Sequence, residues 1–270
     1  LQMPALAITE HANLFSLVKF YKTASSQGIK PIVGADVLLF NPDDAANPWR
    51  LTFLAANHEG YVNLTELVSK GYQKGQRLGV PMVKLEWIEQ HCAGLIMLSG
   101  AMVGDVGKAL LSNNVEQAKK QACFWAELFP DSFYLELHRV GKAREEEYIH
   151  AALDLAAELD LPVVATNDVR FLKSQDFQAH EVRVCINQGR VLDDDRRPKD
   201  YTDQQYLRSA EEMAELFADI PEALANSVEI AKRCNVTLTL GKYFLPDYPV
   251  PEGMTIADVM SLSLIHISEP

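Results

Sequence analysis

Short apolar runs alternate with helical patterns along most of the chain, and this alternation constrains the fold more than any other feature. Each run has the length of a buried strand, whereas the intervening segments repeat apolar residues with the helical period. The predicted strands are Ala5–Thr9, Pro31–Phe40, Leu51–Ala56, Gly94–Ser99, Phe133–His138 and Pro162–Thr166. The predicted helices are Asn13–Ser26, Gly60–Tyr72, Val115–Phe129 and Ala143–Glu158. Repeated strand–helix units predict an α/β fold with a mostly parallel sheet, either a barrel or an open doubly wound sheet.

The charge of the chain narrows the classes of function. The 270 residues include 25 Lys and Arg against 37 Asp and Glu, which gives a formal net charge of −12. This balance argues against an independent nucleic-acid-binding module, because phosphate binding depends on clustered Lys and Arg. No apolar run approaches the roughly 20 residues that span a bilayer, and the four cysteines form no Cys-x-x-Cys pair. We therefore expect a cytoplasmic protein with no membrane partner.

Several common catalytic motifs do not occur in the sequence. No Gly-x-Gly-x-x-Gly or Gly-x₄-Gly-Lys-Ser/Thr pattern follows a predicted strand, which argues against a nucleotide-binding fold of the Rossmann or kinase type. No Gly-x-Ser-x-Gly turn appears either, so a serine hydrolase of the usual α/β type is not supported.

Polar residues cluster at the ends of predicted strands. The first strand ends in Thr9-Glu10-His11, the second contains Asp36, and the sixth runs into Thr166-Asn167-Asp168-Val169-Arg170. In parallel barrels, functional residues gather where the carboxyl ends of the strands meet the following loops. Carboxylates and an imidazole from separate strands could form a metal site. Asp, Asn and Thr also favour such positions for local reasons, helix capping and turn formation, and the spacing alone favours this interpretation over a metal site.

Six segments carry a resemblance to a known family. They are Ala5–Leu14, Gly28–Asp36, Gly60–Leu64, Leu98–Gly100, Val164–Asp168 and Ala179–Val182. In this order they resemble the polymerase-and-histidinol-phosphatase (PHP) domain of the bacterial DNA polymerase III alpha subunit family, of the proteobacterial type. The resemblance covers roughly residues 1–258, and the combination of motifs is highly specific.

The resemblance implies a fold and a division of the chain. It implies a distorted (β/α)7 PHP barrel over residues 1–200, with the first strand and the first motif, His-x-His-Ser, missing before Leu1. Residues 201–260 are expected to be a helical segment and linker towards the polymerase palm. Residues 261–270 do not fit the family and are expected to be a non-native tail. Because a missing strand would leave a neighbouring strand edge unpaired, we expect the chain to be less soluble than an N-terminally extended one.

The family's metal ligands can be compared with this sequence position by position. Members with a working site hold a metal cluster that hydrolyses phosphoesters. His11, Asp36 and Asp168 stand at ligand positions here, as does Glu10 where aspartate is usual. The other comparable positions carry residues that do not bind metals, namely Arg50, Ala101, Val140 and Arg170. We interpret these positions as the vestige of a metal site, in which arginines replace the metal's charge.

The implied function is that of a fragment of a replicative DNA polymerase. The barrel is expected to be a structural and docking domain for the proofreading exonuclease subunit, with no catalytic residue in this chain. Other replicase subunits and DNA would be partners of the missing parts, and Mg²⁺ would be the cofactor of the parent polymerase site. The alternative is a metal-dependent phosphoesterase or 3′–5′ exonuclease with a reduced ligand set that uses Zn²⁺ or Mn²⁺.

The remaining polar candidates are given ordinary structural roles. His58, His138 and His150 are expected to be surface or core histidines, and His180 to open a helix and bond a neighbouring loop. The mixed-charge run Asp193–Asp200 is expected to be a solvated loop.

Overall fold

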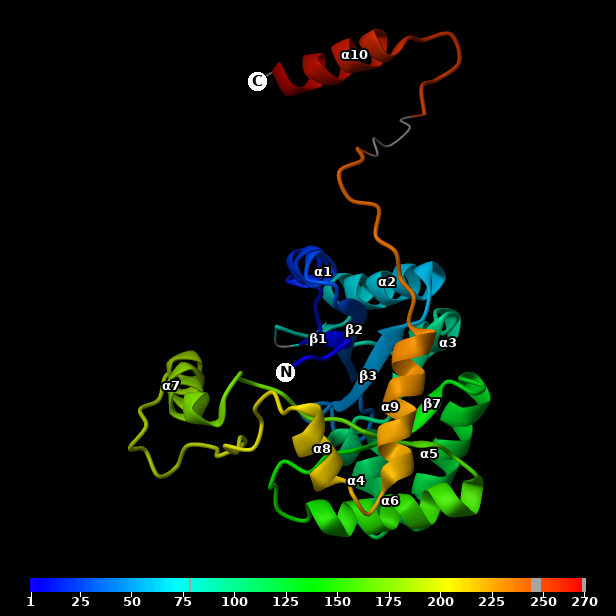
Figure 1. Ribbon diagram of the computed structural model, residues 1–270. Coiled ribbons are helices and arrows are strands. Elements are labelled where there is room, and N and C mark those ends of the chain that lie inside the picture. Colours follow the sequence, from blue (N-terminus) through cyan, green and yellow to red (C-terminus); the bar gives the residue numbers. More distant parts are fainter. Residues whose placement is uncertain (78, 244–248, 269–270) are drawn as a thin grey trace. The chain divides into compact units, whose positions relative to one another are not determined.

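The computed structural model describes residues 1–77, 79–243 and 249–268 and contains a mixed, open six-stranded sheet that forms a half-barrel (Figure 1). The strands are β1 (Ala5–His11), β2 (Lys30–Leu39), β3 (Trp49–Ala55), β6 (Leu95–Leu98), β7 (Phe133–Leu137) and β8 (Val163–Ala165). They lie side by side in the order β1-β2-β3-β6-β7-β8. A separate two-stranded sheet pairs β4 (Gln76–Arg77) with β5 (Val80–Pro81). The predicted α/β fold and all six predicted strands are confirmed.

One strand of the sheet runs against the other five. β3 pairs antiparallel with both β2 and β6, whereas β1–β2, β6–β7 and β7–β8 are parallel pairs. The chain between β2 and β3 is short and contains no helix, so it can return the strand only in the opposite direction. The reversal places the first residues of β3 beside the last residues of β2. Arg50 therefore lies at the end of the sheet where β2 ends.

The inner face of the half-barrel changes from apolar to polar along the strands. Residues paired across the strands share a face, because successive side chains alternate between the two sides of a sheet. One half of this face forms a buried apolar cluster with the end of α9 (Pro221–Arg233): Ile32, Leu54, Ile96, Leu98, Tyr134, Val164, Ile230 and Cys234. The other half, towards the carboxyl ends of β2 and β7, carries Asp36, Thr52 and Glu136, all buried. We call the apolar half the floor of the half-barrel and the other half its polar end.

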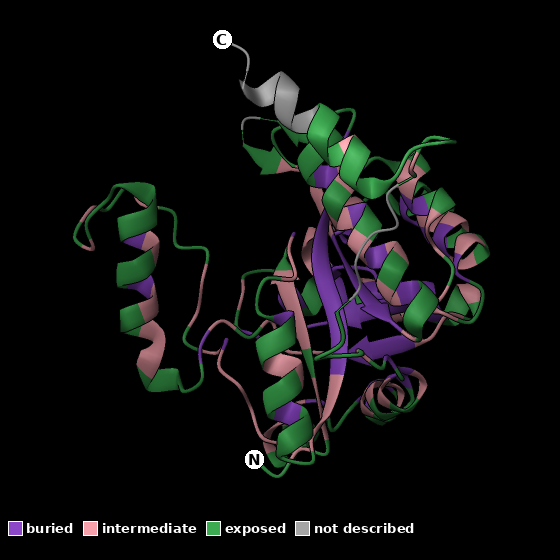
Figure 2. Cartoon of the chain, turned by 90° about the horizontal axis from the view of Figure 1, so that it is seen from above, coloured by how far each residue is buried: buried purple, intermediate pink, exposed green. Residues whose placement is uncertain are grey.

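Within Leu1–Thr237, most helices flank the sheet and expose their outer faces, while the strands at the centre are buried (Figure 2). The helices of the described residues are α1 (Leu17–Ser26), α2 (His58–Lys74), α3 (Leu85–Gln90), α4 (Asp105–Leu111), α5 (Val115–Leu128), α6 (Glu145–Leu159), α7 (Phe177–Gln188), α8 (Ala210–Leu216), α9 (Pro221–Arg233) and α10 (Ile256–Ser268), with 3₁₀ turns at Ala101–Val103 and Ser174–Asp176. All four predicted helices are present. The predicted start at Asn13 is wrong, because residues 13–16 form a turn and α1 begins at Leu17.

Helix α9 covers the floor of the half-barrel and is fastened at its carboxyl end. Ile230 and Cys234 contribute to the buried cluster. Lys30 Nζ donates to the Ala231 carbonyl at 2.6 Å, and Arg233 donates to the hydroxyl of Ser132 at 2.6 Å and to that of Tyr134 at 2.9 Å. The start of β2 and the start of β7 therefore both hold the end of α9.

The chain divides into two compact units, Leu1–Thr237 and Leu238–Pro270. The first contains the sheet and helices α1 to α9. The second contains α10, and residues 269–270 of the expected non-native tail lie outside the described part of the chain. The predicted divisions at residues 200 and 260 stay predictions. Across the described residues, no helix is both long and apolar enough to span a membrane.

Candidate functional site

A cavity of about 950 Å³ lies at the polar end of the half-barrel. Its walls come from the carboxyl ends of β1, β2, β7 and β8, from the amino end of the reversed strand β3, and from the inner side of α7. Six of the eight residues compared with the family's ligands line it: Glu10, His11, Asp36, Arg50, Asp168 and Arg170. The sheet thus brings together residues that are up to 160 positions apart in the sequence.

Arg50 lies between the two aspartates. Its Nη1 is 3.3 Å from Asp168 Oδ1 and donates a hydrogen bond to it, while its Nε is 3.8 Å from Asp36 Oδ2. The Arg50 side chain is only 13% exposed, and those of Asp36 and Asp168 are 9% and 7% exposed. A guanidinium buried between two buried carboxylates offsets one of their two negative charges in a region of low dielectric constant. Arg50 occupies the centre that the two carboxylates share.

Asp168 is held by four side chains at once. Arg170 Nη2 donates to Asp168 Oδ1 at 2.6 Å, in addition to the contact from Arg50. Gln205 Nε2 donates to Oδ2 at 2.8 Å, and Lys142 Nζ lies 3.5 Å from the same oxygen. Burial would raise the pKa of Asp168, but the surrounding cations outweigh burial and hold this pKa well below its usual range. Asp168 therefore stays ionised and fully partnered.

Asp36 has a different environment. Thr52 Oγ1 donates to Asp36 Oδ1 at 2.7 Å, and Arg50 is the neighbouring cation. Burial nevertheless dominates and raises the pKa of the Asp36 carboxyl above its usual value, against the opposing effects of Arg50 and Thr52. The two aspartates of the cavity thus have pKa values shifted in opposite directions.

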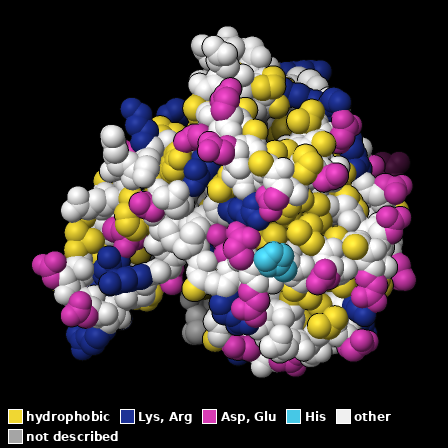
Figure 3. Space-filling model, turned by 60° about the horizontal axis from the view of Figure 1, so that its bottom comes forward, with side chains coloured by type: hydrophobic (Ala, Val, Ile, Leu, Met, Phe, Trp, Pro, Cys, Tyr) yellow, Lys and Arg dark blue, Asp and Glu magenta, His cyan; other side chains and the backbone are white. Residues whose placement is uncertain are grey.

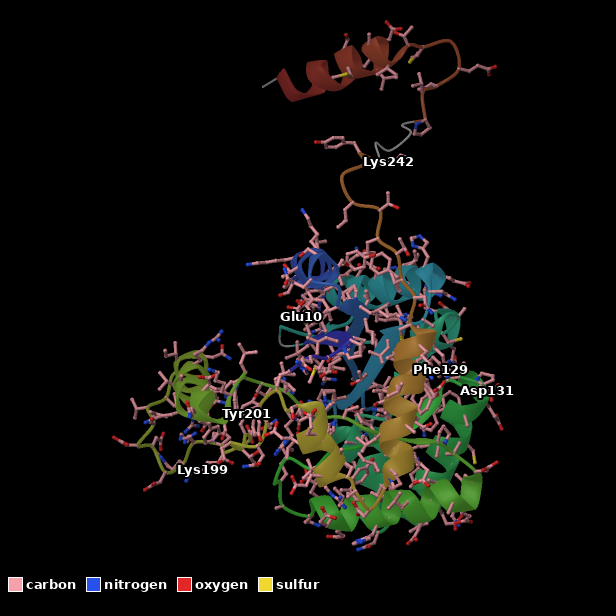
Figure 4. All side chains as sticks on the ribbon, viewed as in Figure 1. Glu10, Phe129, Asp131, Lys199, Tyr201 and Lys242 are labelled. Carbon is pink, nitrogen blue, oxygen red and sulfur yellow. The ribbon has the colours of Figure 1, made fainter. Side chains whose placement is uncertain are left out.

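The segment after α7 contacts two residues of the cavity wall, Asp168 and Arg170. Gln205, which is fully buried, accepts the Arg170 backbone N–H through its own carbonyl at 2.8 Å. The Arg170 guanidinium lies 5.9 Å from the ring centre of Tyr201, in the part of the chain that returns from α7 to the sheet (Figure 4). This segment, which begins the predicted helical segment and linker of residues 201–260, positions the second arginine of the site.

Glu136 and His138 form a buried pair that the sequence analysis missed. His138 Nε2 is 3.2 Å from Glu136 Oε1, and Thr166 Oγ1 donates to the same oxygen at 2.6 Å. Although burial would raise the pKa of Glu136, His138, Thr166 and Arg50 together lower it. His138 was expected to be an ordinary histidine, yet it lines the cavity. The sequence could have indicated this pair, because His138 stands two residues after Glu136. Side chains two positions apart along a strand point to the same face of the sheet.

The two residues that end β1 have separate surroundings. The pKa of His11 is lowered by burial and by the charges of Arg50 and Arg170, so its imidazole is neutral at neutral pH. Glu10 lies at the foot of α1 (Figure 4) and accepts both the backbone N–H and the hydroxyl of Ser16 at 2.8 Å. Glu10 therefore holds the turn before α1.

Ala101 and Val140 are not part of the cavity wall. Both are buried, at 1% and 0% exposure. Val140 donates its backbone N–H to the Glu145 carboxylate at 2.9 Å. Side chains at these two positions were expected to stand among the ligand positions. In the structure both side chains are buried outside the cavity lining.

The remaining polar residues singled out in the sequence, two histidines and the charged loop at 193–200, lie in different surroundings. His180 lies within α7, not at its start, and lines the cavity with its ring against Phe171 and Tyr201. His58 begins α2 beside Tyr61. In the loop expected at 193–200, Arg196 and Arg190 pair with Asp194.

The residues present do not fit a cluster of divalent metal ions. Both oxygens of Asp168 already have protein donors, and the Arg50 guanidinium fills the space between Asp168 and Asp36. A divalent cation there would be repelled by Arg50, Arg170 and Lys142. Among the described residues, no group of three or more His, Cys, Asp or Glu side chains has the arrangement of a metal site.

Comparisons with known proteins relate this chain to a family and to several named proteins. A family model described as the PHP domain matches residues 1–140. Similar proteins named DNA polymerase III subunit alpha come from Pseudomonas fluorescens (55% identical over 254 residues), Pseudomonas aeruginosa (54% over 262) and Escherichia coli (54% over 255). These alignments cover 94–96% of this chain and 22% of each relative, so the chain spans about a fifth of their length. A Bifidobacterium adolescentis structure, provisionally described as a metal-dependent phosphoesterase, aligns with 62% of this chain and 77% of its own at 12% identity and a TM-score of 0.41.

Proposed function

The chain belongs to the PHP domain family, and from this membership we propose that it is the PHP domain of a replicative DNA polymerase III alpha subunit. The support is identity above 50% to proteins of that name along nearly the whole of this chain. DNA synthesis with Mg²⁺, binding of other replicase subunits and a cytoplasmic location belong to the parent protein under this proposal. The polymerase site would lie in the remaining four-fifths of that protein.

Within the parent protein, the barrel acts as a structural and docking domain for the proofreading exonuclease subunit. The observation that carries this role is the contact of Arg50 with both aspartates. Both aspartates of the strand-end cavity therefore already have an arginine as their partner in place of a metal ion. A cavity that is stabilised internally supports a fixed shape, which suits a surface that binds another protein.

Binding of a purified exonuclease subunit tests the docking role. The proofreading subunit of Pseudomonas aeruginosa, whose alpha subunit is 54% identical to this chain, is immobilised and titrated with the 270-residue chain in biolayer interferometry. We expect saturable binding with a Kd of about 1 μM or tighter, as for a specific interface. No binding at concentrations a hundredfold higher would contradict the docking role.

Metal analysis tests the alternative of a metal-dependent phosphoesterase. The chain is incubated with Zn²⁺ or Mn²⁺, dialysed, and analysed for bound metal and for cleavage of a labelled DNA 3′ end. We expect metal well below one equivalent and no cleavage. Stoichiometric metal together with cleavage that Asp168→Asn abolishes would establish the alternative and contradict the proposed loss of the site.

A further inference from the structure

Two segments of this acidic protein are basic. Residues 11–35 and 67–85 together contain seven Lys or Arg and no Asp or Glu. Because the whole chain has a net charge of −12, all its other residues together carry −19. The net charge that argues against nucleic-acid binding is therefore an average over two unlike parts of the protein. By contrast, Asp and Glu side chains are spread across the face that carries α6 (Figure 3).

The fold brings both basic segments to strand β2. The first contains α1, the second contains the end of α2 and the β4–β5 hairpin, and both helices pack against β2 (Figure 1). The hairpin is attached where β2 ends, because the Phe40 N–H donates to the Val83 carbonyl at 2.9 Å and the Val83 N–H donates to the Leu38 carbonyl at 2.8 Å. The start of α1 is held by the bonds from Ser16 to Glu10 at the end of β1, which lies beside the end of β2. The start of α1 and the hairpin therefore lie towards the same end of β2.

Most of the positive side chains in these segments face solvent. Lys30 is engaged with the end of α9, and Lys70 Nζ lies 3.0 Å from His91 Nε2. The other five are exposed, and we call them the basic surface: Lys19, Lys22, Lys74, Arg77 and Lys84. In the part of the chain that the structure describes, none of these five has a carboxylate within ion-pair distance. Their charge is therefore available to a polyanion, whose binding releases counterions.

Aromatic rings accompany the basic surface. Phe15, in the turn before α1, is 82% exposed, and Tyr72, near the end of α2, is 38% exposed. Trp87 is half-buried, and Lys84 Nζ lies 5.6 Å from the centre of its ring. Single-stranded nucleic acids bind through phosphates on cations and through bases stacked on such rings. Duplex DNA keeps its bases stacked on each other, and an acidic peptide has no bases, so the combination of cations and rings favours a single strand.

We propose that the basic surface binds single-stranded DNA, with its cations on the phosphates and with Phe15 and Tyr72 as rings on which bases stack. Only the choice of DNA over RNA rests on the proposed function. The surface is distinct from the strand-end cavity, since none of its five cations and neither ring lines that cavity. The negative charge of the other residues repels DNA, so the strand can approach the chain only from this side.

The test measures binding of a labelled oligothymidylate of about 20 nucleotides to the 270-residue chain by fluorescence anisotropy, in EDTA and over a range of NaCl concentrations. One triple variant removes charge from the basic surface: Lys74→Gln, Arg77→Gln and Lys84→Gln. Its control removes the same charge from exposed sites elsewhere: Lys120→Gln, Lys173→Gln and Lys199→Gln. Phe15→Ser removes the exposed ring, and Tyr243→Ser, at a ring that is 94% exposed, is its control. Every altered side chain is exposed, so each variant is expected to melt near the wild-type temperature.

We expect the wild-type chain to bind with a Kd of about 1–100 μM at low salt, and log Kd to rise with log [NaCl] with a slope of about 3, because each neutralised phosphate of a single strand contributes about 0.7. The triple variant of the basic surface should lose about two units of this slope and bind at least about tenfold more weakly. Phe15→Ser should weaken binding at least about fivefold, as expected for one stacked base. Both controls should bind within about threefold of wild type.

Four results would overturn the inference. They are no binding of the strand by the wild-type chain, equal losses in the two triple variants, wild-type affinity of Phe15→Ser, and tighter binding of a duplex of the same length or of polyglutamate. The last result would identify a different kind of partner for the basic surface. None of these measurements involves the exonuclease subunit, so the docking role stands or falls by its own binding assay.

Discussion

Asp168 collects donors from four separate parts of the chain: Arg50 on β3, Lys142 after β7, Arg170 after β8, and Gln205 after α7. A buried carboxylate with this many partners contributes to stability only while the partners remain, because an unpaired buried charge is costly. The cations differ in burial, since the Arg50 side chain is 13% exposed and that of Arg170 is 25% exposed. The energetic cost of removing each one should follow this order.

Arg50→Ala should therefore destabilise the protein most. It leaves two buried carboxylates without their shared cation, and we expect a loss of about 2–4 kcal/mol in the free energy of unfolding by urea titration. Arg170→Ala should cost less, about 1–2 kcal/mol, because this side chain is more exposed and other donors remain on Asp168. Arg196→Ala, which removes an arginine that is 89% exposed and pairs with Asp194, is the control and should change stability by less than about 1 kcal/mol. Added Zn²⁺ or Mn²⁺ should not rescue Arg50→Ala, and a rescue would show that the cavity binds metal.

Asp105 is a buried carboxylate with no cation beside it among the described residues. Asp105 is 4% exposed, and its Oδ2 accepts the Trp125 indole N–H at 2.7 Å. Burial raises the pKa of Asp105 to about 6, against the opposing hydrogen bond from Trp125. The raised pKa means that the folded protein binds a proton more tightly than the unfolded chain. The stability from this proton is complete below about pH 4 and is lost as the pH rises through about 6.

Asp105→Asn should remove this pH dependence. The amide keeps an acceptor for Trp125 but carries no charge, so it should stabilise the protein at pH 8 by about 2–3 kcal/mol relative to wild type. At pH 4 the difference should be small. Urea unfolding of both proteins at the two pH values measures this change. An equal difference at pH 4 and pH 8 would mean that Asp105 does not titrate between them.

At the scale of elements, two glycines of helix α2 have opposite surroundings. A Cβ on Gly60 would lie 1.8 Å from the Gly94 carbonyl oxygen, where the start of α2 meets the start of β6. A Cβ on Gly71 would lie 3.5 Å from the Met82 carbonyl oxygen, which is an ordinary contact. Gly60 is thus required for the close approach of two backbones, whereas Gly71 is not.

Gly60→Ala should destabilise the protein by about 2–3 kcal/mol, because the backbone of β6 or α2 must move to admit the methyl group. Gly71→Ala changes the same residue type in the same helix. It should be neutral or stabilising by up to about 1 kcal/mol, since alanine favours a helix more than glycine does. Thermal unfolding followed by circular dichroism compares the two. Equal melting temperatures would show that α2 does not approach β6 as closely as described.

At the scale of the whole molecule, the hydrophobic core lies within the first compact unit. The buried cluster of the inner face includes Ile230 and Cys234, and the unit continues to Thr237. Helix α9 supplies the side of this cluster that the sheet itself cannot, because an open sheet leaves one face uncovered. The unit therefore contains all the contacts that its core requires.

A chain that ends at Thr237 should fold and melt cooperatively within a few degrees of the 270-residue chain. A chain that ends at Asp219 lacks α9, exposes the apolar floor of the half-barrel, and should be insoluble or unfolded. Circular dichroism and size-exclusion chromatography of both chains measure these outcomes. Loss of cooperative melting in the chain ending at Thr237 would show that residues after it complete the core.

The sequence by itself determined the elements of this protein. The strands Pro31–Phe40 and Phe133–His138 and the helix Val115–Phe129 are fixed by local hydrophobic periodicity, so they could be predicted within a few residues. The convergence of Arg50 and Arg170 on Asp36 and Asp168 was likewise expected, although only through the resemblance to the PHP family. The turn at residues 13–16 was missed because Glu10 and Asn13 hold it, and side-chain hydrogen bonds of this kind leave no periodic signal.

Only the tertiary structure decided how the cavity is built. The pairing of His138 with Glu136 and the contribution of Gln205 depend on which residues face inward and on where the segment after α7 returns. The same holds for Ala101 and Val140, which stand at ligand positions in the comparison with the family but are buried outside the cavity lining. Periodicity reports the burial of each element separately. Distances between side chains of different elements are set by sheet order, by the reversal of β3 and by loop paths, which no local pattern encodes.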